Sequence, residues 1–227
     1  ADLVGKLEHP SVVQSYDAVA DPEQPYVVME YVPGTTLRKF CRPDNLLSLE
    51  QIVEIGFKCA MALGYVWRQG LIHRDVKPAN VLALMDRDTV VDVKLTDFGS
   101  VLQLDAERTA VHRVGSLAYI SPEQLDGAVI DARADMYSLA AVLYHLIAGR
   151  PPFEGPTQAA LMHQVFNVQP QPLSGLRDGV PASLEALLQR ALEKNPADRP
   201  STWDDFAQSL AGVIARREVP RGKLQGV

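Results

Sequence analysis

Residues 132–148 carry apolar side chains at almost every position around a helix, Met136, Leu139 and Ile147 among them. A surface helix is apolar along one face only, whereas a helix that is apolar all round has to be covered on every side. A glycine and a Pro-Pro pair follow within residues 149–152 and prevent the helix from continuing. The chain is therefore expected to fold around one buried central helix, against which its other elements pack.

Four further segments have the spacing of amphipathic helices and supply those covering elements. The first begins with a capping box, Ser48-x-x-Gln51, in which each side chain accepts the backbone N–H of the other residue. The other three are residues 157–166, residues 183–193 and a last helix for which Ser201 is the expected cap. The larger part of the chain is therefore expected to be helical.

Strand patterns occur only in the first hundred residues. The predicted strands are residues 11–19, 26–32, 81–84 and 90–95, the last two forming a hairpin. Residues 1–8 are expected to be the back half of a helix, and residues 99–122 a long loop of the kind that usually has a function. Because strands and helices occupy different parts of the chain, the predicted fold class is α+β, with a mostly helical large part.

The composition is that of an ordinary globular protein. Of the 227 residues, 47% are apolar, and the formal net charge is −6 with a pI of about 5.4. Non-specific nucleic-acid binders are usually basic, so the charge argues against nucleic acid as a partner. The two cysteines, Cys41 and Cys59, are expected to be unpaired thiols. No apolar run approaches the roughly 18 residues that a membrane-spanning helix needs.

Two short stretches concentrate the side chains that can carry chemistry: HRDVKPAN, which begins at His73, and DFG, which begins at Asp97. Phosphoryl transfer requires a carboxylate that orients the attacking hydroxyl, oxygen ligands for Mg²⁺, and a cation beside the transferred group. Asp75 fits the first requirement, Asn80 and Asp97 fit the second, and Lys77 fits the third. A single Asp or Lys in a loop is usually just solvated, and only the combination favours a function.

Together the two stretches resemble the catalytic loop and the metal-binding turn of protein kinases. The resemblance implies that Asp75 is the catalytic base, that Lys77 lies beside the transferred phosphate, and that Asn80 and Asp97 bind metal. It implies ATP and Mg²⁺ as cofactors, with Mn²⁺ as an alternative metal. The acceptor implied is a Ser or Thr hydroxyl of a protein, because Asp-x-Lys-x-x-Asn is typical of Ser/Thr kinases. The style of the motifs is closest to the eukaryotic-like Ser/Thr kinases of bacteria.

More marks of the family follow in chain order. GSLAYISPE, residues 115–123, resembles the segment that shapes the peptide-substrate site. Within it, Ser116 occupies a position whose hydroxyl often bonds the catalytic Asp and Lys, and an ordinary loop serine is the alternative. The resemblance also implies two structural roles: Glu123 pairs with Arg199 in a buried ion pair, and Asp135 holds the backbone of the catalytic loop.

The segment MEYVPG, residues 29–34, resembles the hinge between the two lobes of a kinase. Backbone groups of Glu30 and Val32 would then bond the adenine of ATP. Met29 would lie at the back of the adenine pocket, and Leu82 would lie beneath the adenine ring. Each of these side chains has an equally simple interpretation as a core residue.

Arg74, beside Asp75, bears on regulation. In the family this arginine often binds a phosphate on the loop that precedes the substrate segment, and phosphorylation can order such a loop. Thr109, which follows Arg108, is the expected phosphate acceptor. Most loop threonines are not phosphorylated, so an unmodified residue is the alternative.

The resemblance extends over nearly the whole chain, but no Gly-rich phosphate loop and no phosphate-gripping strand lysine can be found in these 227 residues. We expect residues 1–32 to be a remnant of the small lobe, comprising the end of the regulatory helix, two strands and the hinge. Residues 33–215 are expected to be a complete large lobe, and residues 216–227 a tail or linker. The chain is accordingly expected to be a piece of a longer protein.

Three functions remain open at this point. The chain can belong to an active Ser/Thr kinase whose first part precedes Ala1, to a pseudokinase or interaction module without a nucleotide clamp, or to an unproductive remnant. The intact set of Asp75, Lys77, Asn80 and Asp97 favours the active kinase, although residues 1–227 alone are expected to have little activity. A cytoplasmic location is implied, and a membrane-anchored parent protein stays open.

Overall fold

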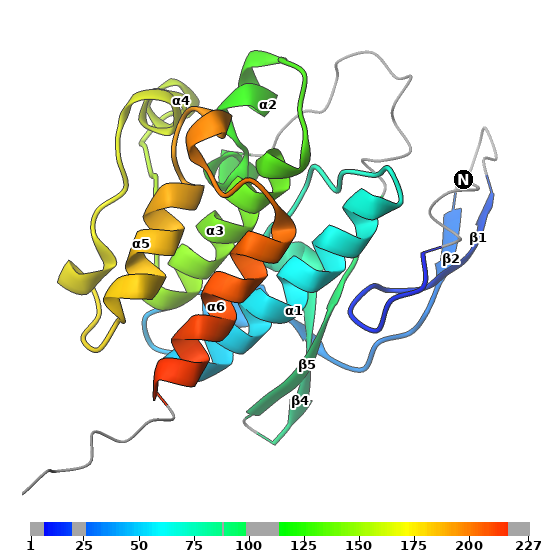
Figure 1. Ribbon diagram of the computed structural model, residues 1–227. Helices are drawn as coiled ribbons and strands as arrows, with labels where there is room; N and C mark the ends of the chain where they lie inside the picture. The colour runs from blue at the N-terminus through cyan, green and yellow to red at the C-terminus, as the bar shows by residue number, and fades with distance from the viewer. Residues whose placement is uncertain (1–6, 20–25, 88, 99–113, 218–227) are drawn as a thin grey trace, which may run out of the picture.

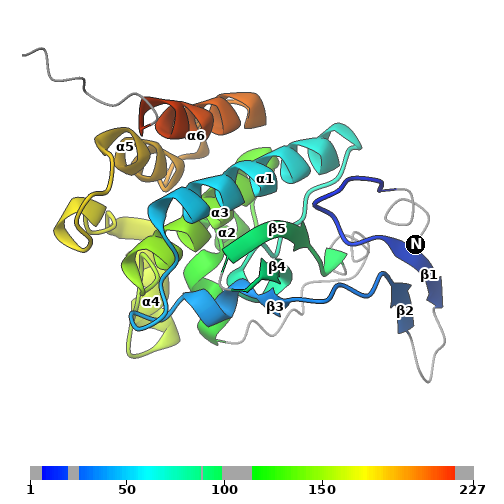
Figure 2. The same cartoon turned by 90° about the horizontal axis from the view of Figure 1, so that it is seen from below.

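The computed structural model describes residues 7–19, 26–87, 89–98 and 114–217. Most of the molecule is helical, with a ribbon of two strands at one side (Figure 1). The helices form layers: α5 (Ala182–Ala191) and α6 (Trp203–Arg217) cover α1 (Leu49–Arg68) and α3 (Ala132–Ala148), and a small sheet lies on the other side (Figure 2). The arrangement is the α+β class that the sequence predicts.

Helix α3 is the buried centre of the molecule, as the sequence predicts. Its first turn is capped by Asp131, whose carboxylate accepts the backbone N–H of Arg133. It ends at Gly149, which has the left-handed conformation (φ 71°) that glycine adopts without strain. Met136 and Leu139 are completely inaccessible to solvent. Helices α1 and α5 pack against α3 and provide the predicted cover.

Helix α1 begins at the capping box that its sequence encodes. Ser48 Oγ accepts the Gln51 backbone N–H at 3.2 Å, and Gln51 Oε1 accepts the Ser48 backbone N–H at 3.3 Å. One face of the helix packs on α6 and another on strand β5. Both cysteines are buried and unpaired, as predicted, and burial raises the pKa of each thiol to about 12.

The shorter helices are α2 (Pro122–Asp126) and α4 (Gln158–Asn167), the second of which is capped by Thr157. The predicted cap of α6 is wrong by one residue. Thr202 Oγ1 accepts the Asp205 backbone N–H at 3.0 Å, whereas Ser201 Oγ donates to the Asp205 carboxylate at 2.8 Å. Two hydroxyl residues stand in a row before the helix, and the one next to its first turn is the cap.

The strands form two separate sheets. Strands β1 (Ser15–Val19) and β2 (Tyr26–Met29) form an antiparallel ribbon. Strands β3 (Thr35–Thr36), β4 (Val81–Asp86) and β5 (Thr89–Leu95) form an antiparallel sheet in that order, and β4 and β5 are the predicted hairpin. Val12 makes a parallel bridge to Leu95, so the first part of the chain is attached to β5 at its end.

Two predicted segments differ from the structure. Leu7 and Glu8 lie outside any helix, and residues 1–6 lie outside the described residues. The Glu8 backbone N–H donates to Tyr65 Oη of α1 at 3.0 Å, so a contact between distant segments replaces a helical hydrogen bond. Part of the predicted loop 99–122 is a 3₁₀ helix, Val114–Tyr119. In the part of the chain that the structure describes, no helix combines the length and apolarity needed to cross a bilayer.

Candidate active site

The loop between α1 and β4 carries the HRDVKPAN motif and is held from below by α3. Asp135, in the first turn of α3, is buried, and its two carboxylate oxygens accept the backbone N–H groups of His73 at 2.8 Å and Arg74 at 2.9 Å. Burial raises the pKa of Asp135, and the charges and N–H groups of the loop oppose that rise. The contact that the sequence assigns to Asp135 is therefore present.

Arg74 has a backbone conformation that side-chain-bearing residues rarely adopt, with φ 68°. Hydrogen bonds hold it there from both sides. Its N–H is bound by Asp135, and its carbonyl oxygen accepts the Gln124 side-chain amide of α2 at 2.9 Å. Backbone strain of this kind costs on the order of 1–3 kcal/mol and persists only where the surroundings fix it. Here the strain turns the chain so that Asp75 follows directly.

Three side chains of the motif meet at the Asp75 carboxylate. Lys77 Nζ lies 2.6 Å from Asp75 Oδ2, and Asn80 Nδ2 donates to the same oxygen at 2.9 Å. Asn80 Nδ2 also donates to the Asp75 backbone carbonyl at 2.9 Å. The Asp75 and Lys77 side chains each keep 23% of their surface exposed, whereas Asn80 is buried. The Asp75 carboxylate is thus fixed in direction but still open to solvent on one side.

The β4–β5 hairpin brings the DFG motif beside this group. Val81 pairs with Leu95, and the Thr96 backbone N–H donates to the Asn80 carbonyl at 3.0 Å. Asp97 therefore follows directly after a contact with Asn80. It has φ 65°, a conformation in which Asp and Asn are enriched, and its side chain is exposed. Among the described residues Asp97 has no ion-pair partner, so its carboxylate is free to bind a cation.

His73 connects the two motifs. Its ring centroid lies 4.6 Å from that of Phe98, and its Nε2 is 3.1 Å from the Thr96 carbonyl oxygen. Because a carbonyl only accepts, Nε2 carries the proton, and Nδ1 is then the acceptor for the Asp75 backbone N–H at 3.4 Å. His73 is fully buried. It is a packed structural residue, as the sequence predicts.

The predicted pair of Glu123 and Arg199 lies beneath the substrate segment. Arg199 Nη1 and Nη2 donate to the two carboxylate oxygens of Glu123 at 2.6 and 2.8 Å, in the bidentate geometry of strong ion pairs. The Arg199 side chain is completely buried. Of the two predicted regulatory residues, Thr109 lies outside the described residues, and for Ser116 only the backbone, in the 3₁₀ helix, is described.

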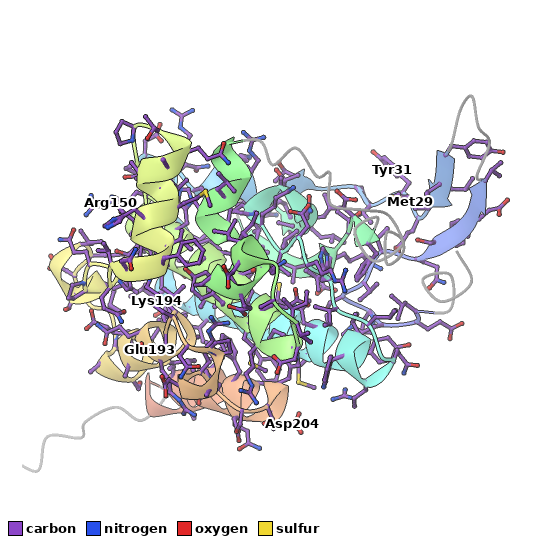
Figure 3. All side chains as sticks on the ribbon, turned by 90° about the horizontal axis from the view of Figure 1, so that it is seen from above. Met29, Tyr31, Arg150, Glu193, Lys194 and Asp204 are labelled. Carbon is purple, nitrogen blue, oxygen red and sulfur yellow. The ribbon has the colours of Figure 1, made fainter. Side chains whose placement is uncertain are left out.

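The predicted hinge residues lie at the β1–β2 end of the molecule. Figure 3 shows Met29 and Tyr31 on that side, and they are 45% and 87% exposed. Glu30 is fixed to both neighbouring segments: its backbone N–H donates to the Gln14 carbonyl at 2.8 Å, and its carboxylate binds Lys94 Nζ at 2.9 Å. This hydrogen bond from Lys94 lowers the pKa of Glu30.

Two of the predicted adenine contacts have backbone or side-chain groups that could make them. The Glu30 N–H is used within the protein, so only its carbonyl remains for a ligand. Leu82, on β4, points away from the buried face made by Val81 and Ala83 and is half-buried. Val32 is half-buried beside β3. The structure does not bring the exposed Met29 side chain into an enclosed pocket.

One contact near the site gives no signal in the sequence. Tyr119 Oη, at the end of the 3₁₀ helix, lies 2.7 Å from His145 Nδ1 of α3, and the two rings are parallel within 12°. Burial lowers the pKa of His145, and a hydrogen bond with the Cys41 backbone opposes that change. The residues are 26 positions apart, and neither belongs to a motif with metal-ligand or catalytic spacing.

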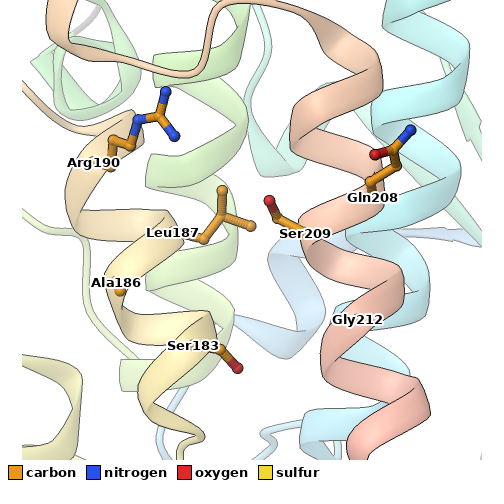
Figure 4. A pocket seen from close by; sticks show the side chains of 7 residues that line it. All are labelled: Ser183, Ala186, Leu187, Arg190, Gln208, Ser209 and Gly212. Atoms are coloured by element: carbon orange, nitrogen blue, oxygen red, sulfur yellow. The ribbon is translucent and has the colours of Figure 1, made fainter.

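A groove of about 350 Å³ lies elsewhere, between α5 and α6 (Figure 4). It is lined by Ser183, Ala186, Leu187, Arg190, Gln208, Ser209 and Gly212. The layer of α1 and α3 separates α5 and α6 from the β3–β5 sheet (Figure 2). The groove therefore contributes nothing to the group of side chains around Asp75.

Comparison with known proteins agrees with the motifs. The profile of the protein kinase domain matches residues 1–210, and the chain therefore belongs to the protein kinase family. It is 38% identical to the serine/threonine-protein kinase PknB of Mycobacterium leprae over 221 residues, which cover 94% of this chain and 35% of that protein. A probable serine/threonine-protein kinase of Clostridium perfringens is 36% identical over 216 residues, 94% of this chain and 31% of its own length.

The resemblance to bacterial Ser/Thr kinases is thereby confirmed. A third relative, from Corynebacterium efficiens, is also named a probable serine/threonine-protein kinase and is 36% identical over 233 residues. The chain spans about a third of the length of these relatives, since it covers 31% to 35% of each. Their names describe those whole proteins, and the activity of the protein studied here is a separate question.

Proposed function

We propose that the protein is an ATP-dependent Ser/Thr protein kinase, which transfers the terminal phosphoryl group of Mg-ATP to a Ser or Thr hydroxyl of a protein. One observation carries the proposal. Lys77 and Asn80 both bind Oδ2 of Asp75, at 2.6 and 2.9 Å, and leave the carboxylate partly exposed. A carboxylate that is held in this way can receive a substrate hydroxyl with little reorganisation.

Each side chain then has one task. Asp75 accepts the hydrogen bond of the acceptor hydroxyl and takes its proton as the oxygen–phosphorus bond forms. Lys77, on the same carboxylate oxygen, places a positive charge where the transferred group carries negative charge. The bound nucleotide supplies the phosphoryl group, and its metal neutralises the charge on the departing diphosphate. Because ATP is a cytoplasmic substrate, we place the reaction in the cytoplasm.

The donor set of the chain fits a hard divalent cation. Asn80 uses its amide nitrogen for Asp75, which leaves its amide oxygen as a ligand. Asp97 supplies an exposed carboxylate. In the described part of the chain, no cluster of three or more His, Cys, Asp or Glu side chains could hold a metal. Mg²⁺ suits such a site, since it usually binds one or two protein oxygens and completes its shell with phosphates and water; Mn²⁺ is the alternative.

The remaining predictions about nucleotide binding and regulation keep their status as proposals. We assign the adenine to the surface between Leu82 and the backbone of Glu30 and Val32, with Met29 at its edge. We assign residues 1–32 to the small lobe, 33–215 to the large lobe and 216–227 to a tail. Arg74 is proposed to bind a phosphate on Thr109, and Ser116 to hold the substrate segment.

The proposal is tested by phosphate transfer to a protein substrate, using the chain with any coding sequence that flanks it in its gene. Asp75→Asn and Asp97→Asn are expected to lower kcat by at least about a hundredfold, since general-base catalysis and charge stabilisation each contribute about 10²–10⁴. Asp86→Asn, on an exposed Asp at the end of β4, is the matched control and should leave transfer unchanged.

Two outcomes would refute the proposal. Transfer that is equal in wild type and both variants would show that these carboxylates have no catalytic role. Tight binding of Mg-ATP without any transfer would favour the alternative, a pseudokinase that serves as an interaction module.

A further inference from the structure

A short basic turn lies close to the proposed acceptor site. The 3₁₀ helix Leu37–Phe40 places Leu37 and Phe40 in the core and leaves Arg38 and Lys39 exposed. In the described part of the chain, neither cation has an ion-pair partner. The next cation along the chain, Arg42, is by contrast paired with Asp44 at 2.9 Å. The turn therefore presents two positive charges that the chain itself does not neutralise.

Packing places this turn at one border of the acceptor site. The turn packs against the 3₁₀ turn Pro78–Asn80 and against β4. Asn80 is the residue whose amide holds the Asp75 carboxylate. A protein segment that delivers a hydroxyl to Asp75 therefore passes close to Arg38 and Lys39.

The segment before α2 forms the second border and faces the same cation. Tyr119 ends the 3₁₀ helix Val114–Tyr119, and Gln124, five residues on, binds the Arg74 carbonyl next to Asp75. Burial raises the pKa of Tyr119, and the charge of Arg38 acts against this rise, so the guanidinium lies within electrostatic reach of the phenol. The same charge acts on the Cys41 thiol.

The groups around this corner offer no negative charge to oppose the cations. His145 holds Tyr119 in place, and burial lowers the pKa of His145, so its ring is neutral at pH 7. Tyr119 and Cys41 are also neutral, because burial raises the pKa of both. The nearest carboxylate in the motif, Asp75, is already bound to Lys77. A substrate with positive charge near its acceptor gains nothing here, whereas one with carboxylates gains two unpaired cations.

We propose that Arg38 and Lys39 form an acid-selecting surface, which favours protein substrates that carry Asp or Glu within about six residues of the Ser or Thr acceptor. This inference rests on the proposed kinase function and adds the substrate class. Solvent-exposed ion pairs are individually weak, about 1.5- to 5-fold in affinity each, so the two cations together are expected to give about three- to tenfold. The preference must also weaken as salt is added, because exposed charges are screened.

The test compares three synthetic peptides that share one Thr acceptor and carry Asp, Asn or Lys at the flanking positions. The wild-type protein, with any flanking coding sequence, is expected to show kcat/KM for the Asp peptide about three- to tenfold above that for the Asn peptide. Arg38→Glu and Lys39→Glu should each reduce or reverse this ratio, mainly through KM. Arg87→Glu, at the tip of the β4–β5 hairpin, makes the same change in net charge and should leave the ratio unaltered.

Binding of fluorescent peptides in which Ala replaces the acceptor Thr separates the two proposals, because it needs no catalysis. Tighter binding of the Asp peptide that Arg38→Glu abolishes supports the surface, even if no phosphate is transferred and the proposed function fails. Transfer to a general protein substrate without any acid preference overturns the surface and leaves the kinase function standing. A preference that survives both substitutions, or that Arg87→Glu removes equally, also overturns the surface.

Discussion

Arg199→Lys is expected to be among the most destabilising conservative changes that this chain offers. The guanidinium of Arg199 has five N–H groups, and every one has an acceptor. Two donate to Glu123, and the others donate to the backbone carbonyls of Glu193 at 2.8 Å, Arg133 at 3.0 Å and Lys194 at 3.1 Å. A lysine ammonium has three donors and cannot form a planar fork, so at least two buried acceptors lose their partner.

The size of the effect follows from this count. A hydrogen bond to a charged group contributes about 1.5–3 kcal/mol, and breaking one side of a buried ion pair costs about 3–5 kcal/mol. We therefore expect Arg199→Lys to lower the free energy of unfolding by about 3–5 kcal/mol, which for a chain of this size lowers Tm by about 6–20 °C. Urea unfolding followed by tryptophan fluorescence measures the change directly.

Two comparisons make the reasoning testable. Arg42→Lys makes the same chemical change in a pair whose side chains are 73% and 65% exposed, and it should cost less than about 0.5 kcal/mol. The double variant Glu123→Leu/Arg199→Met should be less unstable than the sum of its single variants, because neither partner is then left buried and unpaired. A loss below about 1 kcal/mol for Arg199→Lys would refute the role of the five hydrogen bonds.

Three further predictions concern single buried groups. Tyr137→Phe should leave stability unchanged or raise it by up to about 1–2 kcal/mol in urea unfolding, because the buried Tyr137 hydroxyl has no hydrogen-bond partner in the described part of the chain; a clear loss would contradict this. Burial lowers the pKa of Lys194 to about 8. The unfolded chain then binds more protons between pH 8 and 10.5, so this residue makes stability rise with pH in that window, and Lys194→Met should abolish a rise of about 1–2 kcal/mol after allowance for its partial exposure. Asp135→Asn can accept only one of the two loop N–H groups with its single oxygen, and it should lower kcat about tenfold or more with an unchanged circular dichroism spectrum; an unchanged kcat would show that the loop keeps its shape without the carboxylate.

The elements that the sequence predicts correctly are those with a local cause. Helix α1 has its capping box, α3 has apolar residues all round, and the β4–β5 hairpin alternates on both sides of a polar turn. In each case the residues that decide the structure lie within a few positions of one another. The cap of α6 is off by one residue because two adjacent hydroxyls satisfy the same local rule.

The incorrect or missing predictions have causes that are distant in the sequence. Leu7 and Glu8 carry no signal that Tyr65, on α1, replaces a helical hydrogen bond. The contact of Tyr119 with His145 joins residues on different elements. Local patterns cannot supply such contacts, because they depend on how α1 and α3 pack against the rest of the chain.

The candidate site combines both kinds of cause. Which residues carry chemistry could be inferred from the motifs, but not how they are held. Arg74 and Asp97 both have a positive φ, at 68° and 65°, and no local pattern requires it. The strain at Arg74 is maintained by Asp135, which lies 61 residues further along the chain. The core around α3 therefore has a direct bearing on chemistry, because the central helix that organises the fold also supplies the carboxylate that fixes the backbone beside Asp75. For this reason we expect substitutions that shift α3, even far from any ligand, to alter the position of Asp75 before they unfold the protein.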